Sequence, residues 1–467
     1  MNARRELLKN LSSSFFVAFL ALFCLTAFSC ASAAKSFGDE IFSEENAPLF
    51  KEALLSNGIP VVIKNVPLEK NAELRVVFAG GAAASAKGKS GIDQLAFDLL
   101  GEANPKIKER LARGLYFASS ACLADYSYCG FSSACEDFFE SLPIFASSLL
   151  KPEWSHDDYL KKEAAAAAGA ISRSENPRHS LLEAVKKKIY AGSPYLEGAF
   201  YMPSSRVSEY DIEKNISALL NAQRMTIMAA GNFSYREKAE KGGKREKKND
   251  QELFEARSQA LLERLEELFG GVQKSQWSAP AVPPVKLKGK ASQEEQSEFA
   301  GADFYSALCF ACPPRGSDDY EAFALSTLAL DSLLSRELVE RQKIASYCGS
   351  AVLNGKESAA LIVAGGKNGA RDFYGALQEC LKAFPDQNEL SQVLGFYKNI
   401  YISRVLGASH NAGATLDQMA SSLFYEGDAK AFLERPKKIR AATPQDVASA
   451  FEKYFLSENS LYVLLTN

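Results

Sequence analysis

Apolar residues in the first half of the chain follow the spacings of both strands and helices. Two apolar runs flank Asn57-Gly58, the strongest short-range signal for a β-hairpin. Residues 72–78 and 116–131 are also predicted to form strands. Apolar positions recur at helical spacing from Gly91 to Leu100. Further helices are predicted at 136–150, 159–172 and 180–190.

One pattern recurs at the end of each half of the chain. Ser208 is followed three residues later by Asp211, and Thr443 by Asp446. This is the spacing of a helix N-cap with a carboxylate in the first turn, where the helix dipole favours it. An apolar helical stripe and an apolar strand follow in both cases; the strands are residues 225–232 and 461–467. Cap, stripe and strand together indicate a duplication, and hence two homologous lobes.

A polar stretch separates the halves. Residues 236–250 contain seven basic and four acidic residues and almost nothing apolar, which is typical of a solvated loop or linker. A helix is predicted at 261–269, and three prolines between 280 and 284 mark the entry into the second half. The predicted domains are an N-terminal lobe, a charged loop with helix and linker, and a C-terminal lobe, at residues 37–235, 236–290 and 291–467.

The first residues resemble a signal peptide. A basic start precedes an apolar stretch from Phe15 to Phe28, which small residues follow. Cleavage after Ala33 would release a soluble periplasmic protein, which we favour, so residues 1–33 form the predicted leader. Alternatively, Ala27-Phe28-Ser29-Cys30 is a loose lipobox that would leave a lipid on Cys30. Both outcomes predict an exported protein, with membrane attachment only through that lipid.

Charge and cysteine content exclude some functions. The formal net charge is −3, without the basic face expected of a nucleic-acid-binding protein. Seven cysteines follow the leader, an odd number scattered through apolar segments, which indicates small buried core residues. Cys309 and Cys312 have the spacing of a redox motif. They lie in an apolar run predicted as a strand, which would direct them to opposite faces, so redox chemistry is not expected.

Several local strings resemble the pitrilysin/insulinase family of zinc peptidases, which includes the mitochondrial processing peptidase. They are Asn57-Gly58-Ile59-Pro60-Val61, Phe78-Ala79-Gly80-Gly81, Ser193-Pro194-Tyr195 with Gly198, and Ala230-Gly231-Asn232. The resemblance spans nearly the whole chain after the leader. It implies an α+β fold of two homologous lobes, each a mainly antiparallel sheet covered by helices, joined by a linker. This is the metallohydrolase fold of the processing peptidase.

The resemblance also implies a zinc motif, HxxEH, on the first helix. In active members the two histidines bind zinc and the glutamate acts as general base on the bound water. Here Gln94 and Asp98 stand at the histidine positions and Phe97 at the base. Glutamine is a poor zinc ligand and phenylalanine has no proton chemistry. The sequence therefore predicts a degenerate zinc site without catalysis.

The third family ligand is also missing. It is a glutamate that aligns with Gly169 or Ala170; a shifted alignment would offer Glu163, which alone binds zinc weakly. The chain has three histidines, which lie far apart in the sequence at 156, 179 and 410. Because ligand number and geometry must both be met, we expect no metal and no other cofactor.

Active relatives grip the substrate backbone with an arginine and a tyrosine from the second half. Arg341 and Tyr347 lie at the matching junction, with a spacing one residue shorter than the family pattern. A guanidinium can donate two parallel hydrogen bonds, and a tyrosine adds a donor and a flat apolar face. An exposed arginine and a half-buried strand tyrosine without function explain these residues equally well.

Two functions remain from this reasoning. In the first, the chain is a noncatalytic subunit that binds peptide or unfolded protein and forms a heterodimer with a metal-competent relative, as in divided pairs known in the family. In the second, it is a cell-envelope scaffold or peptide-binding protein with no peptidase partner. An enzyme with unusual metal ligands is the least expected alternative.

Overall fold

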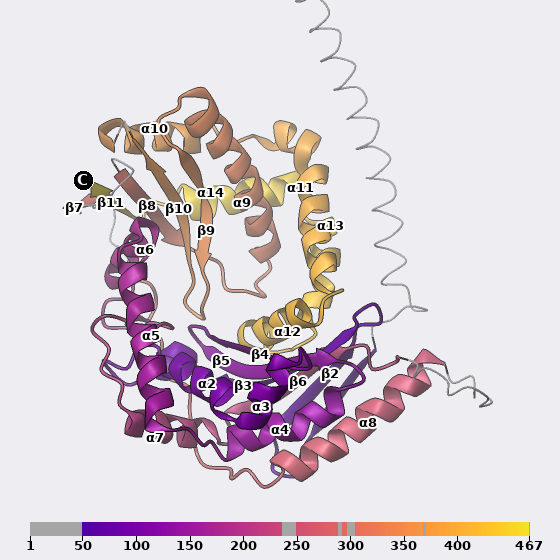
Figure 1. The fold of residues 1–467 in the computed structure, drawn as a ribbon. Helices are drawn as coiled ribbons and strands as arrows, with labels where there is room; N and C mark the ends of the chain where they lie inside the picture. The colour runs from indigo at the N-terminus through magenta and orange to yellow at the C-terminus, as the bar shows by residue number, and fades with distance from the viewer. Residues whose placement is uncertain (1–48, 236–248, 288–291, 297–303, 368–369, 467) are drawn as a thin grey trace, which may run out of the picture. The chain divides into compact units, whose positions relative to one another are not determined.

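Two sheets, one in each half of the chain, carry the fold of this computed structural model (Figure 1). It describes residues 49–235, 249–287, 292–296, 304–367 and 370–466. The predicted leader, with Cys30, lies outside the described residues, as does most of the charged stretch between the halves. Residues Phe50–Asn467 form one unit by their mutual contacts.

The first sheet has six strands in the order β1-β2-β6-β3-β5-β4. They are β1 (Phe50–Leu54), β2 (Pro60–Asn65), β3 (Asn71–Ala79), β4 (Phe117–Cys122), β5 (Tyr126–Ala134) and β6 (Met225–Gly231). Neighbours pair antiparallel except β2 with β6. The hairpin predicted at Asn57-Gly58 is confirmed, and Gly58 has a φ of 87°, which favours glycine. Strand β4 lies at one edge of the sheet.

The second sheet has five described strands in the order β7-β11-β8-β10-β9. They are β7 (Ser292–Gln296), β8 (Phe304–Ala311), β9 (Tyr347–Leu353), β10 (Ala359–Gly366) and β11 (Ser460–Thr466). Only β7 pairs parallel, with β11. The predicted α+β architecture, two mainly antiparallel sheets covered by helices, is confirmed.

Thirteen α-helices connect and cover the strands within the described residues. They are α2 (Ile92–Ala103), α3 (Pro105–Ala112), α4 (Phe138–Leu150), α5 (His156–Ser174), α6 (Pro177–Ile189), α7 (Glu209–Leu219), α8 (Asp250–Phe269), α9 (Tyr320–Leu334), α10 (Ala370–Lys382), α11 (Gln387–Ala408), α12 (Ala412–Glu426), α13 (Arg435–Ala441) and α14 (Pro444–Phe455). Short 3-10 turns lie at η2 (Gly81–Ala84), η3 (Pro194–Leu196) and η5 (Ala431–Glu434). A π-helical turn, η4 (Ser335–Arg341), continues α9.

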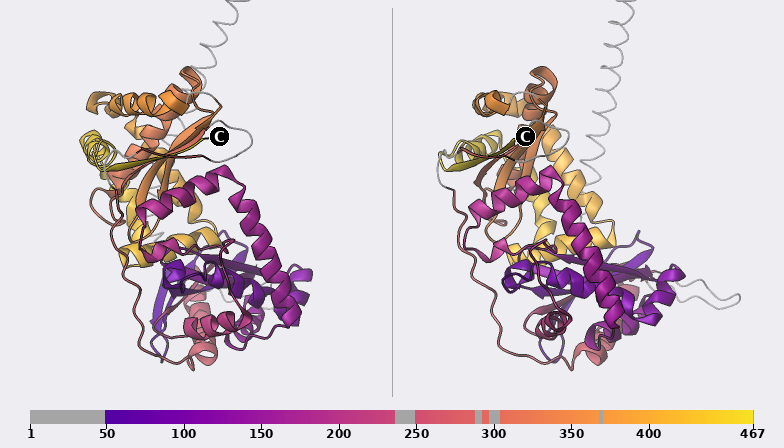
Figure 2. Two further views of the ribbon diagram at one scale, coloured as in Figure 1. Left: turned by 90° about the vertical axis from the view of Figure 1, so that its left-hand side faces the viewer. Right: turned by 60° about the vertical axis from the view of Figure 1, so that its left-hand side comes forward.

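Each sheet is covered on one face by a helix from the other half of the chain (Figures 1 and 2). Helix α12 buries Leu416 and Met419 against Val77 and Met228 of the first sheet. Helix α6 packs in the same way on the second sheet; its buried residues are Leu181, Ala184, Val185 and Ile189. Packing therefore crosses between the two halves in both directions. A fully buried leucine or methionine contributes about 2 kcal/mol, so this exchange holds the lobes together.

The repeated helix starts form as the sequence predicts. Ser208 and Asp211 make a capping box at α7, and Thr443 and Asp446 make the same box at α14. Each hydroxyl accepts from the backbone N–H of the acid at 3.2 Å, while the carboxylate accepts from the backbone N–H of the cap at 2.8 Å. Strands β6 and β11 follow them in their respective sheets, so both halves end in the same local structure.

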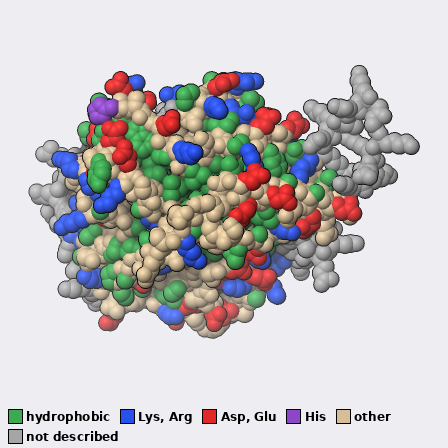
Figure 3. All heavy atoms as spheres, turned by 90° about the horizontal axis from the view of Figure 1, so that it is seen from below, with side chains coloured by type: hydrophobic (Ala, Val, Ile, Leu, Met, Phe, Trp, Pro, Cys, Tyr) green, Lys and Arg blue, Asp and Glu red, His purple; other side chains and the backbone are tan. Residues whose placement is uncertain are grey.

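One helix begins earlier than predicted. Helix α8 starts at Asp250 instead of 261, because Asn249 and Glu252 form a further capping box at the end of the charged stretch. Its buried face consists of Phe254, Ser258, Leu261, Leu265 and Phe269. Helix α8 contacts α4, β1 and β2, so it covers the first sheet. Figure 3 views the molecule from below, and hydrophobic side chains are visible there among acidic and basic ones.

Candidate functional site

The start of α2 depends on a glycine. Gly91 caps the helix with a φ of 77°, and its N–H donates to the carbonyl of Gly198 at 3.0 Å. A Cβ at this position would lie 2.1 Å from the backbone nitrogen of Tyr201. Only glycine fits both the left-handed conformation and this close approach. The contact fixes α2 against the segment that follows α6, and with it the positions of the degenerate zinc motif.

Gln94 and Asp98 lie one turn apart on α2 and bond to each other. The Gln94 amide nitrogen donates to Asp98 Oδ1 at 2.8 Å and to Ser120 Oγ of strand β4 at 3.1 Å. Both side chains are partly buried. An amide nitrogen has two donors, so Gln94 uses both of them within the protein. The two positions predicted to align with the family histidines therefore form a hydrogen-bonded link between α2 and edge strand β4.

Phe97, at the position predicted for the general base, is a core residue. It is 3% exposed, and its ring stacks on Phe78 with 5.9 Å between the centroids. The aligned third-ligand positions offer no donor either, because Gly169 and Ala170 lie in α5 without a ligating atom in their side chains. Zinc in proteins requires three or four Cys, His or carboxylate ligands. The residues present do not fit a zinc ion, and within the described ranges no three His, Cys, Asp or Glu side chains are grouped to hold a metal.

Asp93, beside the degenerate motif, has a structural role that the sequence reasoning missed. Its carboxylate is 3% exposed and accepts from Ser127 Oγ at 2.6 Å and Asn215 Nδ2 at 2.8 Å. Burial raises the pKa of Asp93, and these hydrogen bonds oppose the rise. Asp93 thereby ties α2 to β5 and α7. A buried acid with good partners is a structural anchor rather than a free base.

An apolar cavity of about 340 Å³ adjoins the degenerate motif. Phe97 and Asp98 of α2 line it, together with residues of β4, α3 and α4. The apolar part of the wall includes Leu100, Ile107, Leu111, Tyr116, Phe117, Phe145 and Leu149. Phe117 lies on edge strand β4 and is 54% exposed. The cavity can take an apolar side chain from a ligand that reaches the open edge of the sheet.

Arg341 and Tyr347, the proposed substrate-gripping pair, have different partners. Arg341 ends η4; its side chain is 75% exposed and forms an ion pair with Glu337 at 2.9 Å. Tyr347 begins β9, and the guanidinium of Arg178 lies 4.1 Å from the centre of its ring. Burial raises the pKa of Tyr347, and the Arg178 charge opposes this. Arg178 belongs to α6, so its contact with the second sheet has no signal in the local sequence.

The turn between these two residues is strained. Lys343 has a φ of 55°, the one positive value at a non-glycine residue in the part of the chain that the structure describes. A left-handed conformation costs a residue with a Cβ about 1 kcal/mol. Tyr347 in turn lies against Gly365 on the neighbouring strand, where a Cβ would come within 2.8 Å of the tyrosine ring. A side chain at position 365 would therefore displace the Tyr347 ring.

The three histidines lie at different elements of the fold. His156 begins α5 and bonds to Glu209 at 2.9 Å, which lowers the pKa of Glu209. His179 lies on α6 and His410 follows α11. The seven cysteines of the described residues are free, and five are buried. Cys309 is fully buried in β8 while Cys312 follows the strand, and burial raises the pKa of both to about 12.

The fold has counterparts among solved structures, although the sequence comparisons find none. No family profile matches the sequence, and no curated protein matches it. Solved structures do match over nearly the whole chain, so the class is established by structure.

The chain has the fold of the M16, or pitrilysin-like, peptidases. A protease from Helicobacter pylori matches with a TM-score of 0.73 and 17% identity, over 90% of this chain and 100% of that one. A peptidase M16 inactive domain from Pseudomonas fluorescens matches with a TM-score of 0.72 and 17% identity, over 89% and 97%. A chain of complex III2 from Candida albicans matches with a TM-score of 0.67 and 14% identity, over 89% and 95%.

The TM-scores establish the fold. At identities of 14% to 17%, the comparisons do not establish a function. The fold expected from the resemblance is confirmed, and the similar structures include an M16 domain described as inactive. Among the described residues, no helix has the length and apolar character needed to cross a membrane.

Proposed function

We propose that this chain is a noncatalytic member of the pitrilysin-like family that binds peptide or unfolded protein segments and pairs with a metal-competent relative. One observation carries the proposal. The positions predicted for the zinc motif hold a core phenylalanine and a Gln94–Asp98 hydrogen bond, and a cavity lies beside them at edge strand β4. A site that has lost its reactive groups and kept its binding surface favours binding without cleavage.

The open edge of the first sheet suits an extended peptide. Among the described residues β4 pairs with no strand besides β5, so a further strand could add to its other edge. A peptide added there gains main-chain hydrogen bonds, and every second side chain points toward the same face. Such a side chain could enter the cavity beside Phe117. The expected ligand is therefore an extended segment with a large apolar residue.

Arg341 supports pairing with a second chain. Its guanidinium is largely exposed and is held by one ion pair, so it can donate to a carbonyl or carboxylate of a peptide held between two subunits. Arg178 covers a face of the Tyr347 ring, so a peptide would reach that face only after Arg178 moves. The metal-competent relative would supply zinc, and this chain would supply a wall of the binding chamber.

The predicted leader supports a location outside the cytoplasm. We propose export to the periplasm or the cell envelope, either as a soluble protein cleaved after Ala33 or anchored by a lipid on Cys30. Mass spectrometry of the mature N-terminus distinguishes the two, because a lipidated Cys30 would be the first residue of the mature chain.

The test uses a relative from the same organism that keeps HxxEH. Its cleavage of a fluorogenic peptide is measured alone and with this chain, and the complex is followed by analytical ultracentrifugation. Phe117→Ser removes the exposed aromatic ring at β4, and Phe396→Ser removes a similarly exposed ring (64%) on α11 as a control.

We expect the chain to bind the relative and raise cleavage, and Phe117→Ser to weaken peptide binding about tenfold, since an apolar side chain contributes about 1.5 kcal/mol. Phe396→Ser should leave binding unchanged. If the chain neither binds the relative nor raises cleavage, the pairing is wrong; if Phe117→Ser and Phe396→Ser behave alike, the β4 site is wrong.

An alternative function is a scaffold or peptide-binding protein of the envelope with no peptidase partner. The contact of Arg178 with Tyr347 favours it, because the substrate-gripping pair is then not assembled. Arg341→Gln separates the two functions. A peptidase subunit should lose stimulation of its relative, whereas a scaffold should keep its partners and show no effect of this substitution.

A further inference from the structure

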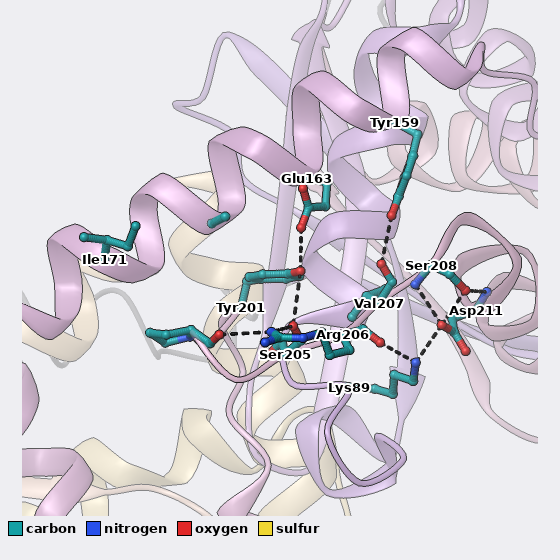
Figure 4. A pocket seen from close by; sticks show the side chains of 12 residues that line it. Lys89, Tyr159, Glu163, Ile171, Tyr201, Ser205, Arg206, Val207, Ser208 and Asp211 are labelled. Carbon is teal, nitrogen blue, oxygen red and sulfur yellow. Dashed lines mark hydrogen bonds and ion pairs between the residues drawn. The ribbon is translucent and has the colours of Figure 1, made fainter.

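A second cavity, of about 620 Å³, lies between α5 and the segment 201–211 (Figure 4). It shares no lining residue with the cavity beside β4. Its walls are held by specific bonds. Tyr159 donates to the carbonyl of Val207 at 2.9 Å, and Lys89 forms an ion pair with Asp211 at 2.7 Å. Lys89 and Asp211 thus neutralise each other, and the hydrogen bond from Lys89 contributes most to lowering the pKa of Asp211 to about 2.

Glu163 brings an unpaired negative charge to this cavity. Its Oε1 accepts from the hydroxyl of Tyr201 at 2.7 Å. Figure 4 shows Glu163 pointing from α5 toward Tyr201. Burial and this bond raise the pKa of Tyr201 to about 12, so the tyrosine stays a donor at neutral pH. Among the described residues, no lysine, arginine or histidine nitrogen lies within 4.0 Å of the Glu163 carboxylate.

Arg206 brings an unpaired positive charge to the same cavity. Its Nη1 donates to the carbonyls of Pro203 at 3.2 Å and Ser205 at 2.8 Å, which fix the guanidinium beside Tyr201. Within the described ranges it has no carboxylate within 4.0 Å, Glu163 included. A guanidinium anchored by backbone carbonyls keeps further N–H donors for a carboxylate.

The α5 wall of the cavity is apolar apart from Glu163. Ala167 and Ile171 follow Glu163 at four-residue intervals on α5, so all three side chains lie on one face of the helix. Ile171 is 55% exposed, and the ring of Tyr159 continues this face. A ligand here meets a carboxylate, a guanidinium and an apolar wall. The volume is within the range of small-molecule sites.

We propose that this cavity binds a zwitterion, either a free α-amino acid or a short peptide with free termini, with its ammonium group at Glu163 and its carboxylate at Arg206. An ammonium group gains a charge-assisted hydrogen bond from the open carboxylate oxygen, and the ligand carboxylate gains one or two from Arg206. The ligand must carry both charges to bind selectively, because Glu163 alone would attract any cation and Arg206 alone would attract any anion. This site is independent of peptide binding at β4 and of any partner subunit.

Calorimetric titration of the full mature chain tests the proposal. The probes are leucine, trialanine, and trialanine with an acetylated N-terminus and an amidated C-terminus. The variants are Glu163→Gln and Arg206→Gln, with Glu175→Gln as control, since Glu175 is exposed at the end of the same helix and does not line the cavity. Ala167→Phe fills the cavity without changing a charge.

We expect leucine or trialanine to bind and the blocked peptide not to bind. Glu163→Gln and Arg206→Gln should each weaken binding roughly 10- to 100-fold, the effect of losing one charge-assisted hydrogen bond. Ala167→Phe should abolish binding, and Glu175→Gln should leave it unchanged. Tighter binding of leucine would identify an amino-acid site, and tighter binding of trialanine a peptide site.

The proposal is overturned if neither free probe binds at about 10 mM, well above the weakest specific affinities considered. It is also overturned if the blocked peptide binds equally, or if Glu163→Gln binds like the control. Circular dichroism checks that each variant is folded. Should Glu163→Gln fail to fold, unchanged binding by Ala167→Phe would overturn the proposal on its own.

Discussion

Lys64 offers the clearest test of the energetics of the first sheet. It lies on β2, is 5% exposed, and has no carboxylate within 4.0 Å among the described residues. Its Nζ donates to the carbonyl of Asn65 at 3.3 Å and lies 5.7 Å from the centre of the Phe50 ring. These contacts do not replace water around an ammonium group. Burial therefore lowers the pKa of Lys64 from 10.5 to about 8.

The magnitude follows from this shift. The folded protein binds the lysine proton less tightly than the unfolded chain, so the charge destabilises the fold. A difference between 10.5 and about 8 corresponds to about 3 kcal/mol. This penalty is fully present below pH 8 and is lost as the pH rises toward 10.5. At pH 10 less than about 1 kcal/mol should remain.

Lys64→Met removes the charge and keeps an apolar stem of similar length. We expect it to raise the free energy of unfolding by about 2 to 3 kcal/mol at pH 7, with a gain that shrinks at pH 10. Urea unfolding at the two pH values measures both quantities, with Lys70→Met as an exposed control. An unchanged or lower stability of Lys64→Met at pH 7, or a gain equal at both pH values, would refute the reasoning.

Three further substitutions test other parts of the structure by urea unfolding. Lys343→Gly should stabilise the fold by up to about 1 kcal/mol by relieving the positive φ, and a loss would contradict the strain. Arg75→Ala should lower the free energy of unfolding by about 3 kcal/mol, because the buried guanidinium joins β3 to Asp417 of α12 at 2.5 Å. A loss under about 1 kcal/mol would mean that apolar contacts alone hold α12 on the sheet. Phe97→Glu introduces the residue expected for the family base and places a carboxylate in the core. It should lower the free energy of unfolding by about 3 kcal/mol or more, and an unchanged value would show that position 97 does not require an apolar side chain.

Local features of the fold could be predicted from the sequence. The hairpin at Asn57-Gly58 and the capping boxes at Ser208 and Thr443 involve residues within a few positions of one another, and each formed as expected. The start of α8 could also be predicted from the sequence, since Asn249 lies three residues before Glu252, as in a capping box. It was missed because the surrounding charges favoured a loop.

The exchange of helices could not be predicted from local pattern. The apolar stripes of α6 and α12 predict burial but not the sheet that buries them, because both sheets offer similar apolar faces. The same limit applies to the candidate site. The contact of Arg178 with Tyr347 joins residues far apart in the chain, and the hydrogen bond from Gln94 to Ser120 depends on how α2 lies against β4.

The central claim is that α2 is a structural helix of this fold that does not bind zinc. Elemental analysis tests it most directly: the purified chain is incubated with excess zinc, dialysed without chelator, and its zinc content measured by mass spectrometry. The account predicts far less than one zinc per chain, because Gln94, Phe97 and Asp98 together supply a single carboxylate. One tightly held zinc per chain, lost in Asp98→Ala, would contradict it.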